Sequence, residues 1–487
     1  MSISAIDRLN QIGIALSSET DINRLLDLIV TEARGFSRAD AGSLYTLEED
    51  RLFFRIAQND TLEKKGKGRS RFQPIPIPLD KKSIAGYVAL TGEVLHIEDV
   101  YTIPEDKPYT FNKSFDQKSG YRTQSMLTIP MKEPEGKVLG VLQLINALDQ
   151  NGRMVPFADQ YHELTLSLAS QAAVALRNAR LIAYIKGLFE ALIKYSAQAI
   201  DARSPHTAGH SRRVAAYALI IAREMTKSDE GPFAEVRFSP EDLERLSYAA
   251  WLHDIGKIGV PEEILDKKWR LPLGWEQIIE NRFLLAAVCA CQGKGEEEAV
   301  KIRRQFTEDC ERILAINTKN FLPDEDREFL ESFAGKTFTD PDGRKKPLLT
   351  EEELCYLSVP RGNLTGEEYR LMQSHVEHTE RIVANIPFTG HLKNVPAIAS
   401  AHHEMLNGTG YPRGLQDNEI CLEARILAMV DIFDALTAMD RPYRKAAPPE
   451  RACAILKDEA SRGRLDPDLV DFFVENCLWE RLEDPPN

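Results

Sequence analysis

One long stretch in the middle of the chain limits how the rest can fold. From Tyr161 to Ile200 the sequence contains no proline, and Gly187 is its single glycine. Proline and glycine are the residues that most disfavour a helix interior, so their scarcity predicts one long helix over residues 161–200. This helix separates a half rich in strand-like patterns from a half rich in histidine. The sequence therefore predicts two bodies joined by a rigid linker.

Apolar residues recur along the second part of this stretch at alternating spacings of four and three. They are Leu181, Ile185, Leu188, Leu192, Tyr195 and Ala199. This heptad pattern is typical of a parallel two-stranded coiled coil, and Asn178 falls on the same seam, where a buried amide would fix the register. The alternative is a helix that packs against its own domain. We favour a homodimer, because a rigid helix that joins two modules can transmit a change from one end to the other.

Length and charge narrow the class of protein. With 487 residues the chain exceeds what one hydrophobic core supports, and such a length favours about two to four domains. Hydrophobic residues make up 43% and charged residues 28% of the chain, as in ordinary soluble globular proteins. The net charge of −14 argues against a binder of nucleic-acid polymers, which usually carries a basic face. A small phosphate ligand held by a few local arginines remains compatible with it.

The cysteines and the apolar segments indicate the compartment. The seven cysteines form no CxxC pair and lie in the second half without the spacing of a disulfide framework, which favours reduced thiols. No apolar run approaches the roughly 20 residues that span a bilayer, and the N-terminus lacks a secretory pattern. We therefore expect a cytoplasmic protein without a membrane span.

The first half mixes helical and strand-like patterns. Residues 22–36 place apolar side chains on one side of an amphipathic helix, and residues 83–90 indicate a short helix. Alternating, β-rich sequence indicates strands at residues 41–46, 52–57, 94–97, 125–131 and 138–145. Helices combined with a largely antiparallel sheet imply an α+β sandwich.

This half resembles a GAF domain over about residues 20–180. The resemblance is carried by residues 120–127, which lead into residues 139–146, and it is closest to the GAF domains of cyclic-nucleotide phosphodiesterases. Members that bind cyclic nucleotides have Asn-Lys after the last strand; here Asn146 is followed by Ala147. The resemblance implies a sensor whose ligand is unknown. A GAF fold used for dimerisation or protein contact is the alternative.

Histidines dominate the second half. Six of the chain's ten histidines lie at expected helix starts or ends in apolar surroundings: His206, His210, His253, His375, His402 and His403. Asp254 and Asp431 are interleaved with them. A set of His and carboxylate ligands without Cys suits iron or manganese, and more than one ion. Two metal ions about 3.5–4 Å apart form the usual clamp for attack on a phosphodiester.

Two local patterns place these histidines on helices. His206 and His210 lie four residues apart in a helix that we expect to begin near Ser204, so both imidazoles would face one side. Thr365 opens a further expected helix through a capping box, and His375 lies on it. Singly, each of these histidines is more often structural than a ligand, so the prediction depends on their joint distribution.

Residues of about 196–480 resemble the HD-GYP family of phosphodiesterases, which hydrolyse the bacterial second messenger cyclic di-GMP. The matching runs are residues 207–214, 253–261, 375–379, 402–404, 410–412, 431–437 and 441–444. The family scaffold is a bundle of helices, whose ends carry the ligands. The implied fold class is thus an α+β GAF sandwich, followed by a long linker helix and an all-α HD-type helical bundle.

The resemblance also implies a role for each matched residue. Metal would be bound by His210, His253, Asp254, His375, His402, His403 and Asp431. Asp254 and Lys257 would be catalytic, the lysine by stabilising phosphate charge or assisting the leaving oxygen. Substrate would be contacted by Gly410, Tyr411, Pro412, Asp434, Arg441 and Arg444, where the arginines offer bidentate contacts to phosphate. His206 is a further candidate ligand, or else it lines the pocket rim, so we expect two or three divalent ions.

Two features depart from the family pattern. Asn407 stands where members usually have Asp, which keeps the hydrogen-bonding shape and removes a charge. An insert at residues 267–363 separates the Lys257 region from the His375 helix. Its sequence indicates helices at residues 275–290, 296–314 and 324–333, followed by a turn at 340–343, and it could serve as a lid, a partner surface or a scaffold.

Together these expectations predict a domain organisation and an activity for the chain. We expect an N-terminal helix at residues 1–20, a GAF sensor domain at 21–160, a linker helix at 161–200 and an HD-GYP phosphodiesterase domain at 201–480. The expected activity is metal-dependent hydrolysis of cyclic di-GMP to linear pGpG, GMP or both, regulated by the GAF domain. The alternative is a receptor that binds the dinucleotide, turns it over negligibly and signals through protein contacts.

Overall fold

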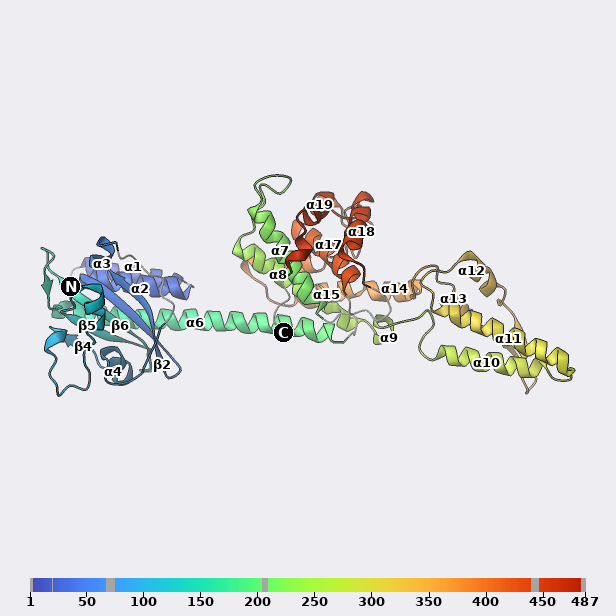
Figure 1. Cartoon of the computed structure of the whole chain (residues 1–487), viewed down its shortest axis with the longest axis horizontal. Helices are drawn as coiled ribbons and strands as arrows, with labels where there is room; N and C mark the ends of the chain where they lie inside the picture. The colour runs from blue at the N-terminus through green and yellow to red at the C-terminus, as the bar shows by residue number, and fades with distance from the viewer. Residues whose placement is uncertain (1–2, 20, 67–74, 204–208, 439–445, 483–487) are drawn as a thin grey trace. The chain divides into compact units, whose positions relative to one another are not determined.

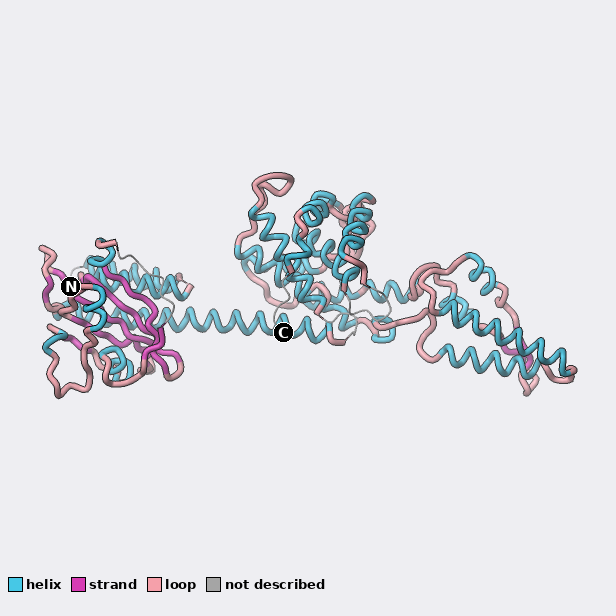
Figure 2. The backbone as a smooth tube through the Cα atoms, in the orientation of Figure 1, coloured by secondary structure: helices cyan, strands magenta, loops and turns pink. Residues whose placement is uncertain are grey.

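The computed structural model describes residues 3–19, 21–66, 75–203, 209–438 and 446–482. These residues form two compact units, Met1–Phe189 and Glu190–Asn487. The larger sheet lies in the first unit, whereas the second is built of helices apart from one short hairpin (Figures 1 and 2). Among the described helices, none combines the length and the apolar character that a bilayer span requires.

The first unit is organised around an antiparallel sheet with strand order β3-β2-β1-β6-β5-β4, to which β7 adds at β6. Its strands are β1 (Ala39–Glu48), β2 (Arg51–Asn59), β3 (Ile75–Ile77), β4 (Leu95–Ile97), β5 (Met126–Lys132), β6 (Val138–Leu148) and β7 (Met154–Val155). The helices are α1 (Ile3–Ser18), α2 (Ile22–Ser37), α3 (Asp60–Lys64), α4 (Ile84–Thr91), η1 (Val100–Thr102) and α5 (Ser114–Ser119).

The amphipathic pattern of α2 explains how this unit packs. One side of the helix is buried against β1 and the first part of the long helix α6 (Asp159–Asp201). This side carries Leu25, Leu26, Ile29 and Val30. A second, smaller cluster packs α4 against the sheet through Val88 and neighbours. Helices therefore cover both faces of the sheet, and the predicted α+β sandwich is confirmed.

The long helix predicted from the lack of proline is α6, which runs from Asp159 to Asp201 over 43 residues. Its first part carries small side chains such as Ala169, Ala172 and Ala173, which are buried against the core of the sheet unit. Along its second part the heptad residues are uncovered: Leu188 is 46% exposed and Tyr195 is 69% exposed. The described chain thus leaves this apolar seam open to solvent.

The second unit is a helical bundle. Its elements outside the insert are α7 (His210–Lys227), α8 (Pro240–Leu252), η2 (Ile255–Gly259), α9 (Glu262–Leu265), α14 (Gly366–Gln373), α15 (His375–Ala384), η3 (Gly390–Leu392), α16 (Val395–Ala399), η4 (Asp417–Glu419), α17 (Leu422–Thr437), α18 (Pro449–Ser461), α19 (Pro467–Glu475) and η5 (Leu478–Arg481). The apolar helix α17 lies in the middle, where Phe433 packs edge-on against Tyr217 of α7 and Phe473 of α19.

The insert folds around a core of its own. It contains α10 (Trp275–Ala290), α11 (Glu296–Asn317), α12 (Asp324–Glu331), the hairpin of β8 (Thr337–Thr339) and β9 (Lys345–Pro347), and α13 (Glu351–Leu357). Phe283, Ile313 and Leu330 form part of one buried cluster that includes only residues of the insert. The helices that we expect at 275–290, 296–314 and 324–333 are present, and the expected turn at 340–343 joins the hairpin strands.

Two expected helix boundaries are wrong. Helix α7 begins at His210 rather than near Ser204, because Gly209 at its N-cap adopts a left-handed conformation with φ of 70°. The helix opened by Thr365 ends at Gln373, and His375 begins a separate helix. There the imidazole of His375 donates from Nδ1 to the carbonyl of Met372 at 2.6 Å.

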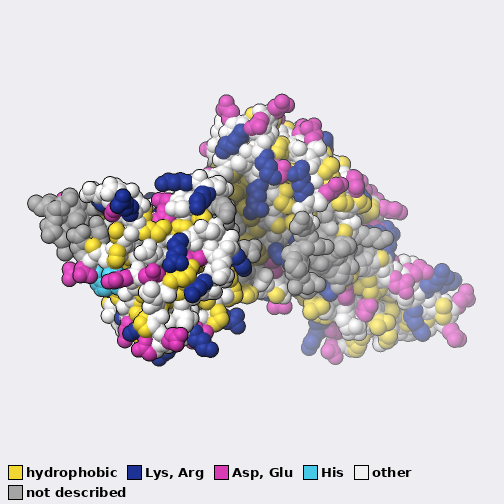
Figure 3. All heavy atoms as spheres, turned by 60° about the vertical axis from the view of Figure 1, so that its left-hand side comes forward, with side chains coloured by type: hydrophobic (Ala, Val, Ile, Leu, Met, Phe, Trp, Pro, Cys, Tyr) yellow, Lys and Arg dark blue, Asp and Glu magenta, His cyan; other side chains and the backbone are white. Residues whose placement is uncertain are grey.

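On the face drawn in Figure 3, Lys and Arg side chains lie among Asp and Glu side chains. This face therefore carries charges of both signs, in a chain whose net charge is −14.

The exposed seam of α6 leads to a prediction about assembly. Replacing Leu188 and Leu192 by lysine should convert a dimer into a monomer, because like charges would face each other across the seam. Light scattering of the purified chain measures the change.

A matched control introduces the same two lysines at Ala183 and Gly187, which lie outside the seam and are exposed. This variant should remain dimeric. A dimer that persists after the seam substitutions would place the interface elsewhere.

Candidate metal centre

The histidines and aspartates singled out in the second half converge on one cavity of about 230 Å³. Its wall includes His210, Asp254, Lys257, His375, His403, Tyr411, Asp431 and Asp434. His253 and His402 are almost completely buried at its base. These residues come from α7, the end of α8, η2, the start of α15, the loop after α16, and α17. The site is therefore assembled from segments that are far apart in the sequence.

Asp254 lies between two groups of imidazoles. Its Oδ2 is 3.4 Å from Nε2 of both His210 and His253. Its Oδ1 is 3.5 Å from Nε2 of His375 and 3.9 Å from Nε2 of His402. Each carboxylate oxygen thus faces a different group, which is the arrangement expected of a carboxylate that bridges two metal ions.

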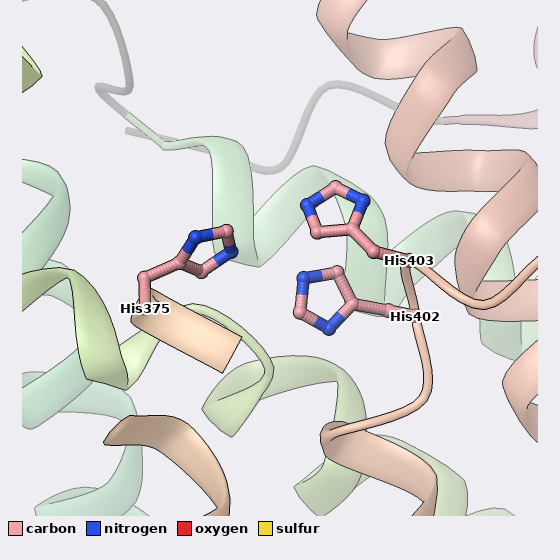
Figure 4. A group of neighbouring side chains, drawn as sticks. All are labelled: His375, His402 and His403. Atoms are coloured by element: carbon pink, nitrogen blue, oxygen red, sulfur yellow. The ribbon is translucent and has the colours of Figure 1, made fainter. Parts of the chain in front are cut away.

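The ligand atoms of each group lie close enough to share an ion. Among the described residues, three sets have all their candidate atoms within 4.8 Å of one another. They are His375 with His402 and His403, His210 with His253 and Asp431, and His253 with Asp254 and His402. Figure 4 shows the first set, in which His375 at the start of α15 faces the neighbouring pair from the loop after α16.

Backbone carbonyls fix the orientation of three imidazoles. His253, His375 and His402 donate from Nδ1 to the carbonyls of Ala250, Met372 and Ala399 at 2.6, 2.6 and 2.7 Å. A ring that donates from Nδ1 presents a free lone pair at Nε2, which is the form that binds a metal ion. Because each acceptor carbonyl lies three residues earlier, the local backbone itself selects this tautomer.

Two of these nitrogens lack any hydrogen-bond partner. Nε2 of His375 and Nε2 of His402 are buried and make no hydrogen bond to the described residues. Leaving a buried polar atom unsatisfied costs about 1–3 kcal/mol, so folds rarely retain such atoms without a ligand. A divalent cation would satisfy both, and the residues present therefore fit a metal centre.

His210 is held differently, by a carboxylate. Its Nδ1 donates to Asp434 at 2.8 Å, and Asp434 accepts two further bonds from Arg213, at 2.6 and 3.0 Å. Asp434 lines the cavity, but its oxygens are engaged by these two neighbours. In this geometry it orients His210 and leaves Nε2 facing Asp254 and Asp431.

The charge states of the cluster suit metal binding. Burial lowers the pKa of His375, of His402 and of His403, the last to about 4, so these imidazoles are neutral near pH 7. Burial alone would raise the pKa of Asp254, but Lys257 and His253 outweigh it and hold that pKa well below the usual value. The site therefore offers neutral imidazoles and an ionised carboxylate without prior loss of protons.

His210 is the exception. Burial opposes its charge, but hydrogen bonds to Asp254, Asp431 and Asp434 raise its pKa well above the ordinary value. A metal ion that binds to Nε2 must displace this proton, so metal binding at this side of the site is coupled to proton release.

Lys257 brings a positive charge to the cavity wall. Its Nζ lies 2.5 Å from Oδ2 of Asp254, and this carboxylate outweighs the effect of burial and raises the pKa of the lysine. The ammonium is therefore charged and lies next to the carboxylate of Asp254, where it can contact an anionic ligand.

Thr379 ties the two halves of the centre together, although its sequence pattern gave it no role. It is fully buried, its hydroxyl donates to the carbonyl of His253, and it accepts from the N–H of Gly256, both at 2.9 Å. Gly256 is required here, because a Cβ would lie 1.9 Å from the carbonyl oxygen of His375. This contact fixes the backbone on both sides of Asp254 against α15.

The loop after the His402-His403 pair closes on Glu404, another residue without a predicted role. Glu404 is buried and accepts from the backbone N–H groups of Arg413 and Leu415 at 2.7 and 2.9 Å. This bond brings Tyr411 back over His403, with the ring centres 4.8 Å apart. Sequence spacing could not reveal this role, because it depends on how the loop folds back.

Asn407 keeps the turn intact, as expected. Its Oδ1 accepts from the N–H and hydroxyl of Thr409, as an aspartate could. Its Nδ2 donates to the carbonyl of Arg462 at 3.2 Å, which an aspartate could not do.

The structure does not cover every candidate residue. His206, Arg441 and Arg444 lie outside the described residues. Tyr411 lines the cavity, whereas Gly410 and Pro412 do not appear in its wall. Gly410 instead allows a tight turn, since a Cβ there would lie 2.3 Å from the backbone nitrogen of Met405.

The Thr379 contact leads to a prediction. Thr379→Val keeps the shape of the side chain and leaves a buried N–H and a buried carbonyl unpaired, each at a cost of about 1–3 kcal/mol. We expect a lower free energy of unfolding for the metal-free protein and a weaker affinity for Mn²⁺, measured by denaturant titration and by calorimetry.

Thr379→Ser retains the hydroxyl and should restore both quantities. If the serine variant behaves like the valine variant, then the packing of the Thr379 methyl group, and not its hydrogen bonds, stabilises the contact with His253 and Gly256.

Known protein families match the two halves of the chain separately. The GAF domain family matches residues 21–176. Two HD domain families match residues 207–332 and 352–469. The break between the two HD matches falls within the insert.

Curated relatives match mainly the second half. A 3′3′-cGAMP-specific phosphodiesterase 3 of Vibrio cholerae is 30% identical over 270 residues, which are 55% of this chain and 35% of the relative. A 3′3′-cGAMP-specific phosphodiesterase 1 of the same species is 39% identical over 129 residues, 26% of this chain and 28% of the relative.

A further relative comes from Thermotoga maritima. It is a cyclic di-GMP phosphodiesterase, 38% identical over 117 residues, 23% of this chain and 30% of the relative. The chain spans about a third of the length of these relatives. They are phosphodiesterases of cyclic dinucleotides.

Proposed function

We propose that this chain, which consists of a GAF domain followed by an HD domain, is a metal-dependent phosphodiesterase that hydrolyses a cyclic dinucleotide. The observation that carries the proposal is the position of Asp254 between two groups of imidazoles, with the orphaned Nε2 atoms of His375 and His402 beside it. This arrangement suits a pair of divalent ions, for which we propose iron or manganese.

We propose cyclic di-GMP as the substrate. The curated relatives support a cyclic dinucleotide of one of two kinds, cyclic di-GMP or 3′3′-cGAMP. The cavity of about 230 Å³ is below the size of a typical small-molecule pocket, about 300–1,000 Å³. It can hold one phosphodiester group, so the bases must lie outside it. Selectivity between the two dinucleotides then depends on contacts made outside this cavity. We propose that Arg441 and Arg444, which lie outside the described residues, hold the substrate phosphates.

Each residue of the cavity has its own proposed role in hydrolysis. Bound divalent ions would supply positive charge that polarises the phosphodiester and lowers the pKa of water. Asp254 holds the two ligand groups in register, and Lys257 offers a charged donor to a phosphate oxygen or to the leaving oxygen. Asp434 and Arg213 keep His210 oriented. The expected products are linear pGpG, GMP or both.

We assign the regulation of hydrolysis to the GAF domain in the first unit. A cavity of about 660 Å³ opens there between the sheet and the segments around α4 and α5. Phe54, Ile84 and Phe111 are among its apolar wall residues, and Gln143 and Asp116 are among the polar ones. Its described wall includes no lysine or arginine.

The alternative function is a receptor that binds the dinucleotide without turnover and signals through the insert. It predicts binding of cyclic di-GMP by the purified chain and no product. Retention of the complete ligand set together with Lys257 favours the enzyme.

Hydrolysis of cyclic di-GMP and of 3′3′-cGAMP by anaerobically purified protein, with products identified by mass spectrometry, tests the proposal. We expect turnover of cyclic di-GMP with manganese or iron. Asp254→Ala should abolish it and reduce metal content, because the bridging carboxylate is lost.

Asp471→Ala, an exposed aspartate of the same unit, should leave both activity and metal content unchanged. Wild-type turnover by the Asp254 variant at saturating metal would refute the metal assignment. Faster turnover of 3′3′-cGAMP than of cyclic di-GMP would correct the substrate.

Whether the site binds two or three divalent ions depends on whether His206 is a ligand. If its imidazole is a ligand, His206→Ala lowers metal content by up to one ion per chain and leaves two bound. If it lines the rim, metal content stays unchanged and KM for the dinucleotide rises. Metal analysis of both proteins, measured side by side, separates the two.

A further inference from the structure

The last turn of α6 contacts the framework of the metal centre at two places. Helix α6 ends at Asp201, and Arg203 follows in a turn that its backbone N–H closes onto the carbonyl of Ile200. Asp201 is buried, with 4% of its surface exposed. Neither residue lines the cavity or belongs to the candidate ligand set.

Arg203 holds the backbone that carries Lys257. Its Nη1 donates to the carbonyls of Lys257 and Ile258 at 3.3 and 2.9 Å, and its Nη2 donates to the carbonyl of Val260 at 3.1 Å. These carbonyls belong to the last residues of η2 and to its C-cap, Val260, where a cation is stabilising. Arg203 therefore fixes the position from which the ammonium of Lys257 reaches Asp254.

Asp201 binds the first turn of α7. Its two oxygens accept from the N–H and the hydroxyl of Ser211, at 3.1 and 2.9 Å. The N-cap of α7 is Gly209, which has no side chain to cap the helix, and the first turn of α7 contains no acidic residue. A carboxylate from α6 thus supplies the cap, next to His210.

We propose that Asp201 and Arg203 are positioning residues through which the end of the linker helix sets the geometry of the metal centre. The proposal rests on the proposed function. Asp201 acts on the metal side through His210, and Arg203 acts on the phosphate side through Lys257. These bonds are 2.9–3.3 Å long, close to the upper end of the usual range for hydrogen bonds, so a displacement of the helix end by about 1 Å breaks both sets of contacts.

Substitutions of Arg203 and Asp201 should change different quantities, the first kcat and the second the affinity for metal. Arg203→Gln should lower kcat by up to about 100-fold, the loss that a misplacement of about 1 Å can cause, while metal content and KM stay near wild type. Asp201→Ala should instead weaken Mn²⁺ binding at the His210 side, so that calorimetry shows a lower affinity for one ion.

Arg237 provides a matched control for Arg203. It also donates to three backbone carbonyls of the same unit, those of Ser228, Ala234 and Val236, but these lie away from the cavity. Arg237→Gln should leave kcat and metal content unchanged, and thermal unfolding of all metal-free variants reports any general loss of stability.

Wild-type kcat in Arg203→Gln, or equal losses in the Arg203 and Arg237 variants, would overturn the proposal for Arg203. Unchanged Mn²⁺ affinity in Asp201→Ala would overturn it for Asp201. If the wild-type chain binds Mn²⁺ but hydrolyses no cyclic dinucleotide, then the proposed function fails, while the calorimetric comparison still decides the role of Asp201.

Discussion

The structure of the second unit depends on how one carboxylate, that of Asp254, is held among four imidazoles. An ionised group with 4% of its surface exposed is costly to bury without compensation. Here the compensation comes from Lys257 on one side and from His210 on the other. The segments that carry these partners must therefore meet within a few ångströms, and His210, His253 and His375 accordingly lie at the ends of α7, α8 and α15.

Much of this arrangement could be predicted from the sequence. The proline-free stretch predicted α6, and the apolar periodicity located the strands and the insert helices, because these patterns report local geometry directly. The resemblance of the His and Asp motifs to the HD-GYP family singled out the residues that the fold brings together around Asp254; their roles as metal ligands stay predictions. The start of α7 at His210 could not be placed, since the sequence does not reveal that Gly209 adopts the left-handed conformation that precedes the helix.

The supporting residues were beyond sequence reasoning for a different reason. Thr379, Glu404 and Asp201 each bond to backbone atoms of a segment that is distant in the sequence or folded back on itself. A hydroxyl or carboxylate in such a role has the same local pattern as one facing solvent. Only the three-dimensional fold distinguishes them, and the same holds for the orientation of His210 by Asp434.

The base of the insert has a further consequence. The side-chain amide of Asn363 donates to the carbonyl of Lys267, and the ammonium of Lys267 pairs with Glu368, so the chain leaves and re-enters the bundle at adjacent points. Loop-closure entropy depends only weakly on the length of chain between two fixed points. With a separate core, the insert is thus a self-contained addition whose length and sequence can change during evolution while the spacing of the bundle helices on either side of it is preserved.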